Sequence, residues 1–403
     1  MAQSVTHNNN KPAIEVVKSR FVRIPSANTY PRFKDLMTGI DQADADILVD
    51  FYHKNGGSDK DHNSHYLLGC LPWLYGETFT PNGPQFINDC LNLWQSPTIR
   101  PTGNKVAAAE VAPFLDFMER WFPLEEERIY FMWWMAWTIR RPEERLTATP
   151  LLRSEHGTGK GFFAECLMSG LMHKTSVALT SLKDVVGDFN DVVESKTLIV
   201  IDEVYKSKKS TTDSLKSIQG NKTLALRRKH KPVVVMDNFI NFIITSNDHI
   251  PVTLEQGDRR FWVPQFLKHK ADLQETESFI NDKLKPWLFA GGLQLVRDYL
   301  EQGDLGRFRP SHAPMTASKQ EILGFTTEDR LTETLSGFLE KEKVVTLKLL
   351  KQRFSEDLQN LSDATIASTL TSLGCQQKRT NSGRFYITKF GLESGLSTSI
   401  TPK

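Results

Sequence analysis

The residues of this chain that are best suited to chemistry lie in a turn of small residues. Residues 156–161 read His-Gly-Thr-Gly-Lys-Gly, and an apolar stretch typical of a helix begins at Phe162. Glycines let backbone N–H groups point into one concavity, the following helix offers its positive N-terminal end, and a lysine can reach β- and γ-phosphates. The turn therefore predicts a phosphate site formed by Gly157, Thr158, Gly159, Lys160 and Gly161.

This turn departs from the usual phosphate-loop pattern at both ends. Ser154 stands six positions before the lysine, where the pattern has Gly. Gly161 stands directly after the lysine, where a Ser or Thr hydroxyl usually ligates Mg²⁺. Taken alone, the turn could equally be a loop that leads into a helix.

A second stretch, Thr197 to Val204, gives the turn a chemical partner. Its β-branched apolar residues predict a buried strand that ends at Asp202 and Glu203. Two carboxylates at the end of such a strand suit Mg²⁺ and an attacking water. The alternative is an acidic cap after a core strand, and the glycine-rich turn upstream argues against it.

Two further stretches supply candidate catalytic residues. Residues 239–247 predict another buried strand, and Asn247 at its end could hydrogen-bond a γ-phosphate or position the water. Arg259 and Arg260 lie on a short loop before an apolar pair, where an arginine finger would lie. The alternatives are an Asn that ends a strand and ordinary surface charge.

A basic segment follows the acidic strand end. Residues 206–231 contain nine Lys or Arg and one Asp. The basic residues end in a tip between two short β-prone stretches, which predicts a hairpin that offers cations to a nucleic acid. The DNA-contacting candidates are Arg228, Lys229, His230 and Lys231. A solvated basic surface is the alternative.

The composition limits the kinds of protein that this chain can be, but it does not indicate a binding partner. The chain has 403 residues, enough for two or three domains, and its net charge is only +2. Its four cysteines have no CxxC spacing and indicate reduced thiols. The N-terminus lacks the apolar core of a signal peptide, and the longest apolar run, 129–137, is too short for a bilayer. We therefore expect a cytoplasmic protein without a membrane partner.

The chain is expected to contain several structural units. Trp133, Trp134 and Trp137 lie in a continuous apolar run, which favours core packing over a base-stacking platform. The C-terminal helices and ribbon have the outline of a winged helix, and a protein-docking domain is the alternative. We predict a disordered N-terminus at 1–30, a segment of unknown role at 31–110, a helical pair at 111–147, an α/β core at 148–290, a linker at 291–325 and the winged-helix-like domain at 326–390.

The ordered set GTGKG, LIVIDE, a basic hairpin, FIITSN and DRRF resembles superfamily 3 helicases over residues 110–290. The most similar branch is that of phages and plasmids, related to poxvirus D5-type and phage P4-type helicases. The resemblance implies an α/β fold with an AAA+-like P-loop ATPase core, preceded by a helical collar at 111–147. It implies ATP and Mg²⁺ as cofactors, with Lys160 on the phosphates, Asp202 on Mg²⁺ and Glu203 as the residue that accepts a proton from the water. It further implies Asn247 as sensor, the region of Lys229 and His230 as the DNA-gripping hairpin, and Arg259 or Arg260 as the finger.

The function expected from this resemblance is an ATP-dependent DNA helicase for replication of a phage or another mobile element. It would move on single-stranded DNA as a homo-hexameric ring, recognise origin DNA, and work with a separate primase or other replication proteins in the bacterial host cytoplasm. We expect no primase activity from residues 31–110. The alternatives are an AAA+ helicase loader or remodeller, and a non-hydrolysing origin-binding protein.

Overall fold

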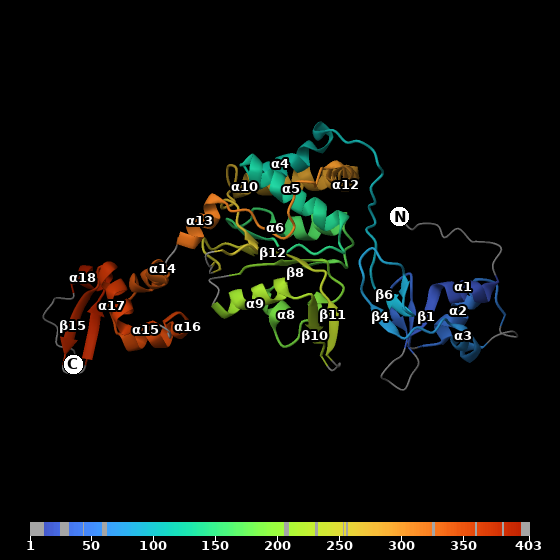
Figure 1. Cartoon of the computed structure of the whole chain (residues 1–403), viewed down its shortest axis with the longest axis horizontal. Coiled ribbons are helices and arrows are strands. Elements are labelled where there is room, and N and C mark those ends of the chain that lie inside the picture. The colour runs from blue at the N-terminus through green and yellow to red at the C-terminus, as the bar shows by residue number, and fades with distance from the viewer. Residues whose placement is uncertain are drawn as a thin grey trace.

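Three lobes in a row make up the structure, a computed structural model (Figure 1). An N-terminal lobe and a C-terminal lobe flank a central lobe that is built on a parallel sheet. The structure describes residues 12–24, 32–42, 44–58, 63–204, 209–229, 233–252, 254, 257–324, 327–358, 361–380 and 383–395.

The central sheet has five parallel strands in the order β13-β7-β12-β9-β8. Their bounds are β7 (Thr149–Arg153), β8 (Val177–Thr180), β9 (Leu198–Ile201), β12 (Asn241–Ser246) and β13 (Phe261–Trp262). Every residue of β7, β9 and β12 is buried, as expected for strands covered on both faces. The two predicted buried strands are thus confirmed, and their carboxyl ends meet at one edge of the sheet.

Alternate strand residues enter two different cores. Leu198 and Val200 of β9 pack with the helices above the sheet in Figure 1, whereas Ile199 and Ile201 pack with the elements below it. The upper layer consists of α4 (Ala112–Trp121), α5 (Glu125–Arg140), α6 (Lys160–Phe162), η2 (Phe163–Met168), α7 (Ser169–Leu171), α10 (Leu273–Ser278), η4 (Phe279–Leu284), α11 (Lys285–Trp287), η5 (Leu288–Gly292) and α12 (Leu293–Gln302). The lower layer includes α8 (Leu182–Val186), η3 (Asp191–Val193), α9 (Lys209–Gly220), β10 (Thr223–Leu226) and β11 (Val234–Asp237).

The tryptophans of α5 form part of the upper core, as predicted. Trp134 is fully buried, and its indole Nε1 donates to the Ala148 carbonyl at 2.8 Å. Trp137 is also buried, and Trp133 packs partly buried against the same cluster. Because α4 and α5 share this core with the sheet, residues 111–147 are not a separate domain in this structure. No helix of the described residues is long and apolar enough to cross a membrane.

The predicted disorder of residues 1–30 is wrong for residues 12–24. They form α1 (Ala13–Arg20) and β1 (Phe21–Ile24), because Val17 and Phe21 are buried against Phe33. Arg20 also binds the Asp35 carboxylate through two of its guanidinium nitrogens. The rest of this lobe consists of β2 (Arg32–Asp35), β3 (Asp41–Gln42), α2 (Asp46–Lys54), α3 (Ser64–Cys70), β4 (Gly76–Thr78), β5 (Phe86–Ile87) and β6 (Cys90–Asn92), and η1 (Ala108–Val111) follows it.

The predicted linker at 291–325 is also wrong. Its residues form α12 and α13 (Ala317–Gly324), and both helices pack on the central lobe. Val296 of α12 and Ile322 of α13 are buried in the upper and lower cores. Asp298 accepts hydrogen bonds from the backbone N–H and the hydroxyl of Thr102. These buried contacts make both helices part of the central lobe.

The C-terminal lobe contains the predicted helices and ribbon. Leu335, Ile366 and Tyr386 lie in its core, and Ser362 accepts from the Thr365 N–H as the predicted helix cap. A third strand joins the ribbon in the antiparallel order β14-β16-β15. The elements are α14 (Thr327–Leu339), β14 (Val344–Val345), α15 (Leu347–Arg353), α16 (Ser355–Leu358), α17 (Asp363–Ser372), β15 (Gln376–Thr380), β16 (Gly383–Ile387) and α18 (Lys389–Glu393).

Candidate nucleotide-binding site

The glycine-rich turn connects the end of β7 to α6, as the sequence predicts. Gly157 and Gly159 have positive φ angles of 76° and 97°, a region that side chains rarely adopt. A Cβ atom at Gly157 would lie 2.3 Å from the Leu273 side chain, and one at Gly159 would lie 2.8 Å from that of Ile280. Both positions therefore favour glycine for their backbone conformation, and an added Cβ would also displace the ends of these two side chains.

Hydrogen bonds to two of its carbonyl groups hold the turn in place. The Trp121 indole N–H donates to the Thr158 carbonyl at 2.8 Å, and the Phe163 N–H donates to the Gly159 carbonyl at 2.9 Å. No described residue accepts a hydrogen bond from the backbone N–H groups of residues 156–159. Backbone N–H groups that lie directly before a helix N-terminus suit an anionic ligand such as a phosphate.

Lys160 connects the turn to the neighbouring strand. Its Nζ donates to the Ser154 hydroxyl at 2.5 Å and to the Asn247 side-chain oxygen at 2.7 Å. Burial lowers the pKa of Lys160, and the charges of Asp202 and Glu203 oppose this shift. The structure therefore brings four of the predicted site residues to one edge of the sheet. Ser154, which the sequence reasoning treated only as a departure from Gly, helps to place the lysine.

The strand order explains why these side chains meet. β12 lies between β7 and β9, so Asn247 lies between the lysine and the carboxylates. Asp202 Oδ1 accepts from the Thr245 hydroxyl at 2.5 Å and from the Glu203 N–H at 3.0 Å. Glu203 is exposed and has a φ of 52°, an uncommon conformation for a residue other than glycine. The Asp202 side chain is thus held by hydrogen bonds, whereas Glu203 is exposed to solvent.

The donor set at this edge fits Mg²⁺ in its chemistry. Mg²⁺ is commonly held by one or two carboxylates together with phosphate oxygens and waters. Among the described residues there is no cluster of three or more His, Cys, Asp or Glu that could hold a metal. Asp202 would therefore hold the ion together with the phosphates of a bound nucleotide and not in a cage made by the protein alone.

A Gly161→Ser variant is expected to lower the Mg²⁺ concentration needed for half-maximal ATP turnover. An added Cβ at Gly161 meets no atom within 4 Å, so the hydroxyl that the phosphate-loop pattern usually provides can be restored without a clash. Mg²⁺ titrations of ATP turnover would measure the change. Gly161→Ala is the matched control, since it adds the carbon without the hydroxyl, and equal midpoints for the two variants would contradict the expectation.

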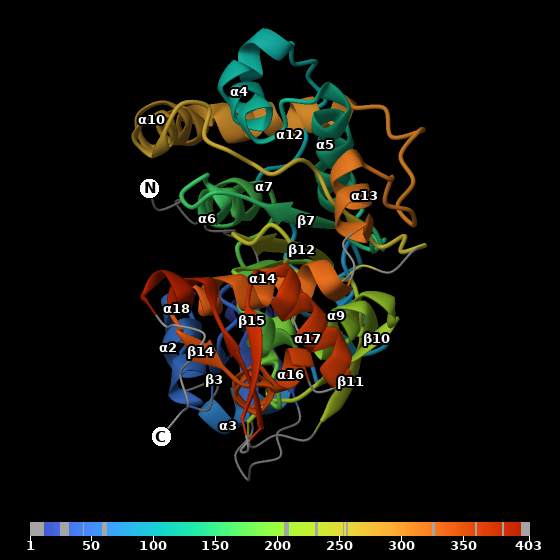
Figure 2. The same ribbon diagram turned by 90° about the vertical axis from the view of Figure 1, so that its left-hand side faces the viewer.

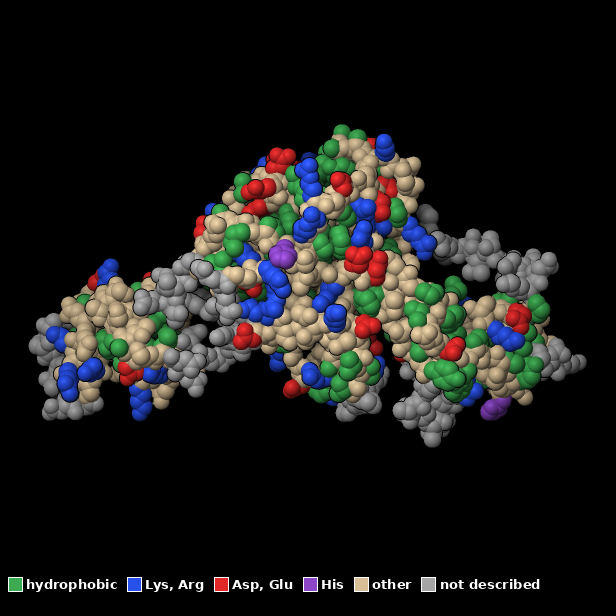
Figure 3. Space-filling view, in the orientation of Figure 1, with side chains coloured by type: hydrophobic (Ala, Val, Ile, Leu, Met, Phe, Trp, Pro, Cys, Tyr) green, Lys and Arg blue, Asp and Glu red, His purple; other side chains and the backbone are tan. Residues whose placement is uncertain are grey.

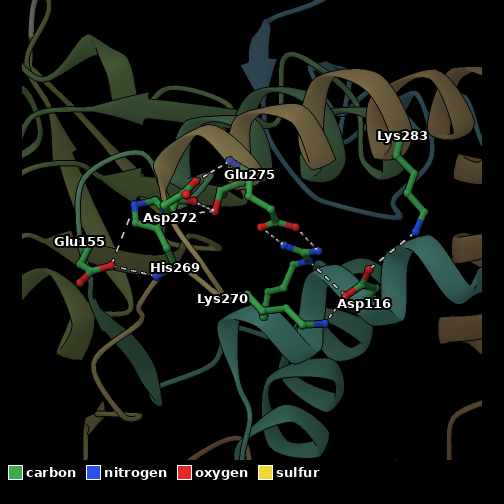
Figure 4. A network of polar contacts seen from close by, with 9 residues as sticks. Asp116, Glu155, His269, Lys270, Asp272, Glu275 and Lys283 are labelled. Carbon is green, nitrogen blue, oxygen red and sulfur yellow. Dashed lines mark hydrogen bonds and ion pairs between the residues drawn. The ribbon is translucent and has the colours of Figure 1, made fainter.

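A polar network fixes the outer side of the turn (Figure 4). The His269 backbone N–H donates to the Glu155 carboxylate at 2.8 Å, and His269 Nε2 lies 2.9 Å from the His156 carbonyl oxygen. Next to it, Arg120 of α4 binds Glu275 of α10 through two nitrogens at 2.7 and 2.8 Å. Sequence reasoning missed His269 and Arg120, because neither belongs to a motif and their partners lie more than 100 residues away.

The two candidate finger arginines do not join this site. Arg259 is exposed and Arg260 half-buried, and both precede β13 at the amino edge of the sheet. The Arg260 carbonyl accepts from the N–H of Thr149, where β7 begins. Since β7 has five residues, the arginine backbone lies roughly 17 Å along the strand from the glycine-rich turn, at about 3.3 Å per residue.

The predicted basic hairpin is formed by β10 and β11. The strands pair antiparallel, with Leu226 opposite Val234. Lys229 is exposed at the tip, whereas His230 and Lys231 lie outside the described residues. Arg228 is half-buried, and its guanidinium binds the Glu194 carboxylate at 3.0 Å. Of the two described candidates for DNA contact, Lys229 is therefore the more accessible.

The space-filling view agrees with the small net charge of the chain. On the face drawn in Figure 3, Lys and Arg side chains lie on the central and C-terminal lobes together with acidic ones. No extended surface of a single charge covers this face. On this face, contact with a polyanion would therefore depend on local groups.

Comparison with known proteins identifies relatives of this chain. Residues 152–260 match a family described as a family of unknown function, DUF5906. The chain is 27% identical over 216 residues to a protein of Nitratiruptor phage NrS-1 named DNA primase-polymerase. The aligned part is 53% of this chain and 29% of that protein, so the alignment spans less than a third of the relative.

The same phage protein provides the structural likeness. Its solved C-terminal region, residues 305–718, superposes with a TM-score of 0.59 at 18% identity, covering 94% of this chain and 99% of that one. At this identity the likeness establishes a shared fold alone. A structure of JCV helicase covers 60% of this chain at 13% identity with a TM-score of 0.30, which is too low to carry an argument.

Proposed function

We propose that this chain is an ATP-hydrolysing DNA helicase that serves the replication of a phage or another mobile element, in the manner of superfamily 3 helicases. The observation that carries the proposal is the hydrogen bond between Lys160 and Asn247 at the sheet edge where Asp202 and Glu203 also lie. The similarity to a phage primase-polymerase supports a role in phage DNA replication.

Each side chain of the site has one task in this proposal. Lys160 binds the β- and γ-phosphates of ATP, and Asn247 orients the γ-phosphate or the attacking water. Glu203, which is accessible at the strand end, accepts a proton from that water. Asp202 holds Mg²⁺, which when bound supplies positive charge against the phosphate oxygens. The Thr245 hydroxyl fixes the orientation of Asp202.

The distant arginines complete the site of a neighbouring subunit. Lys160 lies at the carboxyl edge of the sheet, whereas Arg259 and Arg260 lie at its amino edge. In a cyclic assembly each interface joins different surfaces of two identical chains, so opposite edges of one lobe can meet across it. This separation supports a ring, which we propose to be a homo-hexamer.

The flanking elements supply contacts to DNA and to other proteins. The tip of the β10–β11 hairpin would touch single-stranded DNA through Lys229, together with His230 and Lys231. The C-terminal lobe would act as a winged-helix-like reader of origin DNA, and α4 and α5 would contribute a collar to the ring. A separate primase or other replication proteins would act with it.

ATP turnover and strand displacement test this function together. The purified chain is expected to hydrolyse ATP faster with single-stranded DNA and to separate a partial duplex only when ATP is present. Turnover without strand displacement would favour a helicase loader or remodeller. Binding of origin DNA with no turnover would favour a non-hydrolysing origin-binding protein.

A Lys229→Ala variant is expected to weaken binding to single-stranded DNA while it leaves DNA-independent ATP turnover unchanged. The lost phosphate contact should reduce the slope of log affinity against log salt by about 0.7. Binding titrations at several salt concentrations would measure this slope. Lys222→Ala is the matched control, because Lys222 is exposed at the other end of β10. Equal slopes for both variants would show that the hairpin tip does not contact the DNA.

A further inference from the structure

A fully buried lysine lies directly behind the loop that carries Arg259 and Arg260. Lys319 of α13 has no solvent-exposed side-chain surface, and the site chemistry described above does not use it. Its Nζ donates to the carbonyl oxygens of Asp258 and Phe261, at 2.7 Å each. A charge is rarely buried this deeply in proteins unless it is paired and hydrogen-bonded, because its desolvation is costly.

The partners of Lys319 enclose the arginine loop on both sides. Asp258 Oδ1 lies 3.7 Å from the lysine Nζ and also accepts from the N–H groups of Arg260 and Phe261. The carbonyls of the two arginines are bound as well, that of Arg259 by the Ala313 N–H and that of Arg260 by the Thr149 N–H. Every backbone carbonyl from 258 to 261 therefore has a donor, and Lys319 supplies the first and the last.

The helix that carries Lys319 is itself anchored at the sheet edge. Thr316 accepts from the Lys319 N–H as the helix begins, and its hydroxyl donates to the Val263 carbonyl just after β13. Figure 2 shows α13 on the β7 side of the sheet. α13 is the last helix of the central lobe, and α14 of the C-terminal lobe begins at Thr327.

We propose that Lys319 is a positioning residue that sets the direction in which the Arg259–Arg260 loop points toward the ATP site of a neighbouring subunit. This inference rests on the proposed function. The lysine touches neither substrate nor reacting atoms, and it acts by holding the loop backbone at two carbonyls.

A Lys319→Met variant of the full chain tests the structural part of this inference. Met keeps the length and the apolar stem of the side chain but has no donor for the two carbonyls. Amide hydrogen exchange is expected to become faster in residues 257–263 and to stay unchanged in the glycine-rich turn. Unchanged exchange in residues 257–263 overturns the inference, whether or not the protein hydrolyses ATP.

Mixed assemblies of differently tagged subunits test the consequence for ATP turnover. Lys319→Met alone is expected to lose about 10²-fold in turnover, the scale of a 1 Å misplacement, with unchanged ATP binding. Mixing with Lys160→Ala should restore turnover, because that subunit offers an intact arginine loop. Mixing with an Arg259→Ala/Arg260→Ala subunit should restore nothing. Recovery with neither partner, together with faster exchange throughout the chain, would assign Lys319 to fold stability alone.

Two further variants separate the role of Lys319 from a general loss of stability. Ile322→Ala removes a buried apolar side chain of the same helix and leaves the two hydrogen bonds of the Lys319 ammonium in place, so it is expected to lower the melting temperature and keep turnover. If Lys319→Met does not fold, Lys319→Gln keeps a donor without the charge and should have a smaller defect of the same kind. Undiminished turnover in Lys160→Ala would contradict the proposed function, and the exchange experiment would still decide the role of Lys319.

Discussion

A Lys160→Ala variant is expected to keep the fold and to lose ATP turnover by at least about 10²–10³-fold, the scale seen when one preorganised charge-stabilising donor is removed from an active site. The Lys160 ammonium is held between the Ser154 hydroxyl and the Asn247 side-chain oxygen. The nearest Lys or Arg in sequence is Arg153, and its guanidinium donates to the carbonyls of His249 and Pro264. Arg153 therefore cannot replace the missing charge.

Steady-state ATP turnover and a thermal melt of the same preparations would measure this effect. Lys196→Ala is a suitable control, because Lys196 is another partly buried lysine of the central lobe and donates to the Thr175 carbonyl. It precedes β9 at the amino edge of the sheet, away from Asp202. Turnover near the wild-type value in Lys160→Ala, with full turnover in the control, would remove the glycine-rich turn from the active site.

The sequence could predict the parts of the site that follow from local patterns. The turn at 156–161 and the strand that ends at Asp202 are each visible within about ten residues, and both form as expected. That Lys160 would contact Asn247, 87 residues away, required the strand order, because β12 is inserted between β7 and β9. Parallel strands bring their carboxyl ends together whichever residues separate them in the chain.

Contacts with no motif could not be predicted in the same way. Lys319 lies in an unremarkable stretch, and its partners Asp258 and Phe261 are 61 and 58 residues away. Its own helix, α13, and the preceding α12 fall in the predicted linker, because short amphipathic segments give a weak signal until their buried face meets a partner. Residues 12–24 fall in the segment that is predicted to be disordered, although Phe21 completes a small core with Phe33.

The placement of the arginine loop leads to the second large effect. Arg259→Ala or Arg260→Ala is expected to reduce ATP turnover by about 10³–10⁵-fold, as for arginine fingers that stabilise charge during phosphoryl transfer. Phe261 and Trp262 are 0% and 1% exposed, so they anchor the loop directly behind Arg259, which is exposed, and Arg260, which is half-buried. Only the true finger should show the full loss, and Arg307→Ala, which removes an exposed arginine after α12, should show none.

Mixing experiments would show whether the finger acts between subunits. A Lys160→Ala subunit lacks the phosphate-binding lysine but carries an intact arginine loop, and the arginine variant has the opposite defect. The two features lie at opposite edges of the sheet. In the ring proposed above, each interface would therefore combine the turn of one chain with the loop of the next. Turnover is therefore expected to recover in part when the two inactive proteins co-assemble. No recovery in verified mixed rings would show that the arginine acts within its own subunit or only holds the loop in place.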